Sequence, residues 1–87
     1  MSVRPMLIHY MVTVFYPGSP NQELDLFISD VARINRGMRA GSEYNCATNT
    51  RDISFSFAKE SPARAFGREV LSTSRRITTA RVDEMRC

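Results

Sequence analysis

The sequence predicts an α+β fold of the ferredoxin-like class, with the order βαββαβ, one antiparallel sheet and two helices on one face of it. Two stretches with helical periodicity predict the helices, and four short stretches rich in β-branched and aromatic residues predict the strands. Of the 87 residues, 43% are hydrophobic and 24% charged, as in ordinary globular proteins. We therefore expect one domain over residues 1–87 with a single core.

The first strand is expected at residues 6–16, "MLIHYMVTVFY". This run contains His9 and Thr13 and lacks a small-residue cleavage site, so it does not have the pattern of a signal peptide. It is also too short to cross a bilayer, and the chain has no longer apolar run. We predict a strand that ends at Pro17, and no association with a membrane.

A helix is expected to follow, with Ser19 as its cap and Pro20 at its first position. Apolar residues then recur at spacings of three and four, which places them in one stripe along a helix. The stripe consists of Leu24, Phe27, Ile28, Val31, Ile34 and Met38. Gly37 is placed to end this helix.

The rest of the chain predicts two strands, a second helix and a last strand. Residues 42–48 and 53–58 are the expected strands, joined by a hairpin turn at residues 49–52. The second helix is expected to start with Ser61 as its cap and Pro62 at its first position. Its buried side would consist of Ala63, Phe66, Gly67, Val70 and Ser74. The last strand is expected within residues 76–84.

The stretch "RDISFSF" at residues 51–57 sets apolar residues two apart, as an RNA-reading strand does. In a strand, Ile53, Phe55 and Phe57 share one face, and only one face of the sheet meets the helices. Exposing the phenylalanines would bury serine hydroxyls and leave large rings in water. We therefore predict that the phenylalanines lie in the core and do not stack on bases.

The same alternation defines an open face on the first strand. Ile8, Tyr10, Val12, Val14 and Tyr16 make the better core face. The predicted open face consists of Leu7, His9, Met11, Thr13 and Phe15, beside Ser54 and Ser56. An apolar patch of this kind predicts a protein interface, either with a partner protein or with a second copy in a homodimer.

Arginine dominates the basic residues, because Lys59 is the single lysine among 12 basic residues in a chain of net charge +3. Arg64, Arg68 and Arg75 recur at helical spacings, and Arg76 follows. We interpret these four as a ridge that binds an anion or an acidic partner. The alternative is the solvated side of an amphipathic helix.

No catalytic residue, metal site or cofactor is predicted. His9 is the single histidine, and it does not stand at metal-ligand spacing from Cys46 or Cys87. The loop "YPGSPN" after the first strand lacks the arginine that acylphosphatase-type enzymes place there. Two cysteines do not make a disulfide framework, so we expect a reducing, cytoplasmic location.

The opening "MLIHYMVTVFYP" resembles the first strand of muconolactone-isomerase-like proteins. Met6, Leu7, His9, Thr13, Val14 and Pro17 carry the likeness. The resemblance implies a ferredoxin-like chain that dimerises face to face around a cavity. The chain after Gly37 lacks the tryptophan-rich segment of that family, and no catalytic residue is carried over.

These patterns favour a small non-enzymatic protein-binding module, an adaptor or inhibitor that acts through the open face and the arginine ridge. One alternative is a ligand binder or isomerase-type enzyme of the dimeric α/β barrel class that uses His9. Another is a nucleic-acid-binding protein whose arginines contact phosphates.

Overall fold

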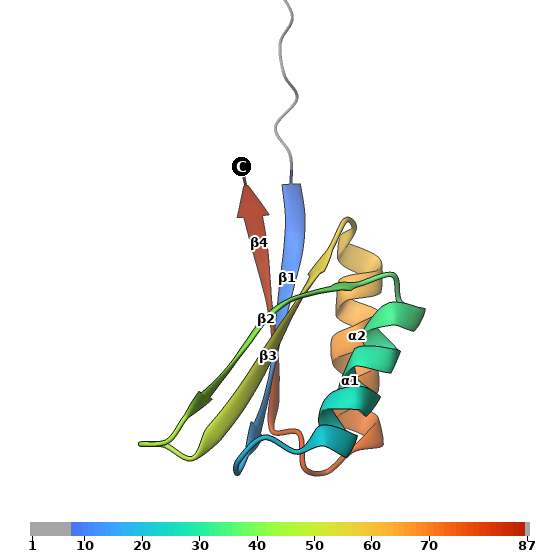
Figure 1. The fold of residues 1–87 in the computed structure, drawn as a ribbon. Coiled ribbons are helices and arrows are strands. Elements are labelled where there is room, and N and C mark those ends of the chain that lie inside the picture. Colours follow the sequence, from blue (N-terminus) through green and yellow to red (C-terminus); the bar gives the residue numbers. More distant parts are fainter. Residues whose placement is uncertain (1–7, 87) are drawn as a thin grey trace, which may run out of the picture.

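The computed structural model describes residues 8–86, which form four strands and two helices (Figure 1). The elements are β1 (Ile8–Pro17), α1 (Gln22–Ile34), β2 (Met38–Asn45), β3 (Thr50–Phe57), α2 (Glu60–Thr73) and β4 (Thr79–Arg86). The strands form one antiparallel sheet in the order β2-β3-β1-β4. Both helices cover the same face of the sheet, so the predicted ferredoxin-like α+β fold is confirmed.

The core lies between the sheet and the helices, and alternate residues of the two central strands build it. Val12, Val14 and Tyr16 of β1 are fully buried. Ile53, Phe55 and Phe57 of β3 are at most 1% exposed. The prediction that these phenylalanines lie inside is confirmed, because their strand neighbours of opposite parity face away from the helices.

The second helix docks on the sheet through Phe66. Its ring centroid lies 5.2 Å from that of Phe55 in an edge-on contact and 5.3 Å from that of Phe57. Gly67 of α2 faces β4, where a Cβ would stand 3.6 Å from the Cβ of Ala80, an ordinary contact that alanine would also make. The predicted buried side of α2 is confirmed for Ala63, Phe66, Gly67 and Val70, whereas Ser74 is only half-buried and caps the helix.

Both predicted helix starts are wrong. Asn21, and not Ser19, caps α1, because its Oδ1 accepts a hydrogen bond of 3.0 Å from the backbone N–H of Leu24. α2 begins at Glu60, and its cap, Lys59, makes no side-chain capping bond. Pro62 is tolerated in the first turn because the first four N–H groups of a helix have no intrahelical acceptor.

The first helix ends earlier than the apolar stripe predicts. The N–H of Gly37 donates to the carbonyl of Ala32 at 2.7 Å, and that of Arg36 to Arg33 at 3.0 Å, the paired bonds of a Schellman motif. Arg36 takes the left-handed conformation, with φ of 67°. A Cβ on Gly37 would lie 2.4 Å from the Phe57 ring, so glycine is needed where the chain turns.

The boundaries of the hairpin formed by β2 and β3 also differ from the prediction. Met38 begins β2 and does not extend the helix, and it is 75% exposed. The turn lies at residues 46–49 and not at 49–52. Asn45 Oδ1 accepts hydrogen bonds from the N–H groups of Ala47 at 3.0 Å and Thr48 at 3.3 Å. This asparagine turn ends β2 at Asn45, before the strand can pair further with β3.

Candidate functional site

The candidate site is the open face of the sheet, which no described element covers (Figure 1). Strand pairing places the predicted residues of β1 and β3 on this face together. They are His9, Met11, Thr13, Phe15, Ser54 and Ser56. Thr13 is buried at 7% exposure and the others are half-buried. Leu7, also predicted for this face, lies outside the described residues.

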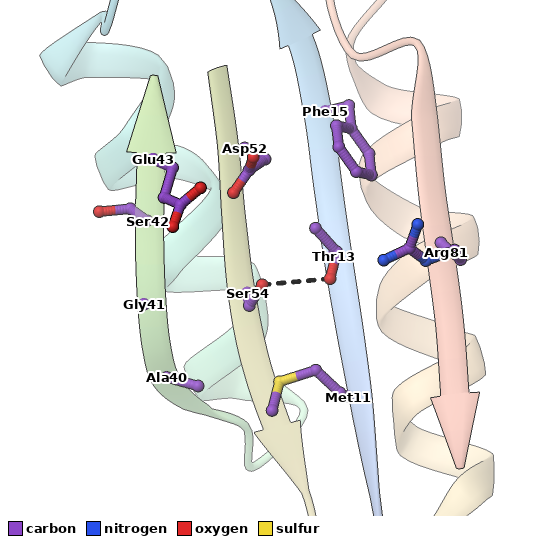
Figure 2. A pocket seen from close by; sticks show the side chains of 10 residues that line it. All are labelled: Met11, Thr13, Phe15, Ala40, Gly41, Ser42, Glu43, Asp52, Ser54 and Arg81. Atoms are coloured by element: carbon purple, nitrogen blue, oxygen red, sulfur yellow. Dashed lines mark hydrogen bonds between the residues drawn. The ribbon is translucent and has the colours of Figure 1, made fainter. Parts of the chain in front are cut away.

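A hollow of about 400 Å³ occupies the middle of the open face (Figure 2). Its lining consists of Met11, Thr13, Phe15, Ala40, Gly41, Ser42, Glu43, Asp52, Ser54 and Arg81. The register of β2 against β3 shifts between Arg39 and Gly41. A Cβ on Gly41 would meet no atom within 4 Å, so the missing side chain leaves open space at that edge of the hollow.

One cross-strand row runs through the hollow from edge to edge. Thr13 lies opposite Arg81 on one side and Ser54 on the other, and Ser54 lies opposite Gly41. The hydroxyls of Thr13 and Ser54 are hydrogen-bonded to each other at 3.1 Å (Figure 2). The centre of the face is thus polar, and its two central hydroxyls are partners in one hydrogen bond that can persist when the face is covered.

The two edges of this face differ in charge, because two carboxylates without a basic partner lie at the β2–β3 edge and an arginine–aspartate pair lies at the β4 edge. Glu43 of β2 lies directly opposite Asp52 of β3, an arrangement that is unfavourable for two like charges. Within residues 8–86, neither carboxylate has a basic side chain within salt-bridge distance. At the other edge, the Arg81 guanidinium carbon lies 5.7 Å from the Phe15 ring centroid, and its Nε donates to Asp83 at 2.9 Å.

Strand alternation accounts for Asp52 and Arg81 on the open face, but neither residue belongs to a sequence motif that predicts a site. Glu43 was not predicted as a site residue, because its place on the open face depends on an irregularity in the register of β2 that the sequence does not predict. His9 lies opposite Met85 and two residues beyond Met11, and it does not line the hollow. Within the described part of the chain, no three histidine, cysteine or acidic side chains are grouped for metal binding.

The predicted arginine ridge is divided. α2 ends at Thr73 with Ser74 as its cap, so Arg75 and Arg76 lie in the following turn and not on the helical stripe. Arg64 and Arg68 border a groove beside β4, whereas Arg76 lies near Asn21 and Leu24 at the start of α1. The prediction assumed that the helix continues past Thr73. Because α2 ends there, the four side chains do not share one surface.

A second polar cluster, which no sequence pattern predicts, joins β1, α1 and β3. Tyr16 donates its hydroxyl proton to Asp25 Oδ1 at 2.5 Å and accepts the N–H of Asn21 at 2.9 Å. Arg51 Nη2 donates to Asp25 Oδ2 at 2.9 Å. The Arg51 and Asp25 side chains are only 11% and 14% exposed. The cluster ties the start of α1 to the sheet, so we assign it a structural role.

Burial, followed by the hydrogen bond to Asp25, raises the pKa of Tyr16 above its ordinary value of 10.0. Between pH 10 and the folded-state pKa, the unfolded chain ionises Tyr16 while the folded chain keeps it neutral, so the free energy of unfolding falls as pH rises. In a titration of tyrosinate absorbance, one of the three tyrosines is expected to ionise late. Tyr16→Phe should remove that late component, and its persistence in the variant would contradict the assignment.

Comparison with known proteins leaves the function open. No protein-family profile matches the chain, and no curated protein matches it. Among solved structures, it is similar to the crystal structure of a NIPSNAP family protein of unknown function from Agrobacterium tumefaciens, with 11% identity and a TM-score of 0.49 over 92% of this chain and 87% of that one. Such an identity transfers no function. No helix within residues 8–86 is long and apolar enough to span a membrane.

Proposed function

We propose that the protein is a small non-enzymatic protein-binding module, that its open sheet face is the binding surface, and that a second copy of the chain occupies it. The observation that supports this is the row Arg81–Thr13–Ser54–Gly41, which has a cation at one edge and an acid-bordered gap at the other. Such a face is complementary to itself under two-fold symmetry.

The geometry of the pairing follows from the strand order. A two-fold axis parallel to the strands, between β1 and β3, puts β4 of one copy over β2 of the other. Each Arg81 then faces the space at the partner's Gly41, beside the partner's Glu43 and the partner's Asp52. Two sheets packed about 10 Å apart fit such a contact, because an arginine side chain reaches across that space.

The balance of charge favours the same arrangement. In the single chain, Glu43 and Asp52 repel each other, and an arginine placed between them offsets that repulsion. Arg81 is paired with Asp83 in the single chain, and that pair is exposed to solvent, so sharing the guanidinium with the partner's acids costs little. Met11 and Phe15 are half-buried apolar side chains that association takes further out of water. Thr13 and Ser54 already share one hydrogen bond, which lowers the cost of removing their hydroxyls from water.

The size of the face indicates a dimer in exchange with its monomer. Four strands of about eight residues cover roughly 19 Å by 26 Å, or about 500 Å² per copy. The total is near the lower limit for specific interfaces. An exposed free thiol at Cys46 agrees with the reducing, cytoplasmic location that we also propose.

The dimer is tested by reversing the charges at the contact and measuring self-association of the full chain by sedimentation equilibrium. Arg81→Glu alone, and Glu43→Lys with Asp52→Lys, are each expected to weaken self-association at least about tenfold, because like charges then face each other. Mixing the two variants should restore a heterodimer. Gly41→Val should also prevent association while leaving the fold intact, because its side chain enters open space in the monomer.

Arg75→Glu is the matched control, since it makes the same change of charge in the turn after α2 and should leave the dimer unchanged. A wild-type chain that stays monomeric at about 1 mM, where even an association of about 4 kcal/mol is half formed, would refute the proposal. Equal association of all variants would refute the Arg81 contact specifically.

A further inference from the structure

Within residues 8–86, no strand pairs with the outer edge of β4. β4 lies at the end of the sheet order and pairs only with β1 among the described strands. That pairing is regular over eight consecutive residue pairs, from Ile8 opposite Arg86 to Phe15 opposite Thr79. β2, at the other edge of the sheet, has an irregular register, a feature that discourages the addition of a further strand.

A shallow groove of about 170 Å³ accompanies this edge on the helix side of the sheet. Its lining consists of Arg64, Gly67, Arg68, Leu71, Ala80 and Val82. Gly67 has no side chain, and it lies close to Ala80, so the floor consists of helix backbone, whose polar groups are bonded within the helix, and small apolar side chains. Leu71 is 42% exposed beside it, which makes the groove a place where an apolar side chain would gain contact.

The rim of the groove is basic. Arg64 is held by Glu60, with its Nε 2.9 Å and its Nη2 2.8 Å from Glu60 Oε2. Arg68 has no acidic group within salt-bridge distance among residues 8–86. Glu84, the next helix-facing residue along β4 after Val82, is engaged by Arg86 at 3.3 Å. Among the described residues, the groove therefore presents a guanidinium without an acidic partner next to a strand edge without a paired strand.

We propose that this edge binds an acidic peptide segment in extended conformation, which adds to β4 as a fifth strand. A strand about 4.8 Å from β4 makes main-chain hydrogen bonds to it, and every second side chain then points toward α2. Apolar side chains of the segment contact Leu71 and Val82, and carboxylates pair with Arg68. This surface is separate from the open face, because Ala80 and Val82 point to the side of β4 opposite Arg81.

The charge pattern favours an acidic peptide over the other occupants of a free edge. Pairing β4 with the β4 of a second copy would bring Arg64 and Arg68 of both copies together around the symmetry axis, where they repel. A nucleic acid would match the arginines, but it offers neither a backbone that continues the sheet nor side chains for the apolar floor.

Fluorescence anisotropy with a labelled eight-residue peptide tests the proposal on the full chain. The probe carries valine and glutamate in turn at every second position, with threonine between them, so that both residue types face α2 together. Two controls carry lysine in place of the acids or methyl groups on alternate backbone amides. We expect the acidic peptide to bind and both controls to fail. Arg68→Glu should weaken binding at least about tenfold, whereas Arg75→Glu, with the same charge change away from the groove, and Arg81→Glu on the opposite face should have little effect.

Equal affinity for the methylated peptide would overturn strand addition, and equal affinity of the Arg68→Glu variant would overturn the rim contact. Binding of a single-stranded oligonucleotide that depends on Arg68, without binding of the peptide, would assign the groove to nucleic acid and refute the proposal. Self-association that Arg68→Glu strengthens would identify the edge as a homotypic contact. None of these outcomes depends on the open-face dimer, which Arg81→Glu disrupts independently.

Discussion

Phe66→Ala is expected to lower the free energy of unfolding by about 3–5 kcal/mol, a large share of the roughly 5–15 kcal/mol typical of a domain. Phe66 is fully buried and contacts both Phe55 and Phe57, so its ring connects α2 to the central strand β3. Truncation removes buried apolar area and leaves a cavity that the rigid sheet cannot fill. Urea unfolding followed by circular dichroism measures the loss.

Leu71→Ala is the control for this prediction. It lies on the same helix and removes a side chain that is 42% exposed, so it should cost less than about 1 kcal/mol. A loss below about 1.5 kcal/mol for Phe66→Ala would show that α2 repacks on the sheet without its aromatic anchor.

Asp25→Asn is expected to cost about 2–3 kcal/mol, although it preserves the shape of the side chain. The carboxylate accepts hydrogen bonds from both Tyr16 and Arg51, and asparagine leaves the largely buried guanidinium without a counter-charge. Arg51 Nε already lacks a hydrogen-bond partner among the described residues, so the side chain has no spare contact to replace the lost one. Residual exposure of the pair keeps the cost below that of a fully buried ion pair.

A double-mutant cycle with Arg51→Met separates the ion pair from the shape of the site. Arg51→Met alone leaves the Asp25 carboxylate without its counter-charge. In the Asp25→Asn background no carboxylate remains at position 25, so Arg51→Met should cost less stability there. Additive effects of the two substitutions would show that the pair contributes little and that packing around Tyr16 carries the stability.

Strand alternation predicted the interior and the open face correctly because it depends on one repeating contact, the face of the sheet toward the helices. It placed Phe55 and Phe57 inside and Met11 and Phe15 on the open face from parity alone. Helix boundaries failed because each depends on a single side chain or backbone angle. Asn21 competes with Ser19 as a cap, and the stop at Arg36 uses a left-handed arginine, where glycine is the usual signal.

The parts of the site that were missed depend on register and not on pattern. Glu43 faces Asp52 because β2 contains an irregularity, and a shift of one residue would turn Glu43 to the other face. The arginine ridge failed for a related reason, since Arg75 shares a helical face with Arg64 only if α2 continues beyond Thr73. The C-terminal end of α2 could not be located from the sequence, because the residues around its cap, Ser74, contain no glycine or proline to mark the end of a helix.

The exposure of β2 determines how the folded chain opens. None of its eight residues is buried, so its attachment depends on the hydrogen-bond ladder with β3 and on the turn at residues 46–49. Such an element detaches in a sub-global fluctuation that leaves the core of β1, β3 and the helices intact. The amides of β2 should therefore exchange with deuterium at a lower free energy of opening than those of β1, and any partner that covers the open face should slow them.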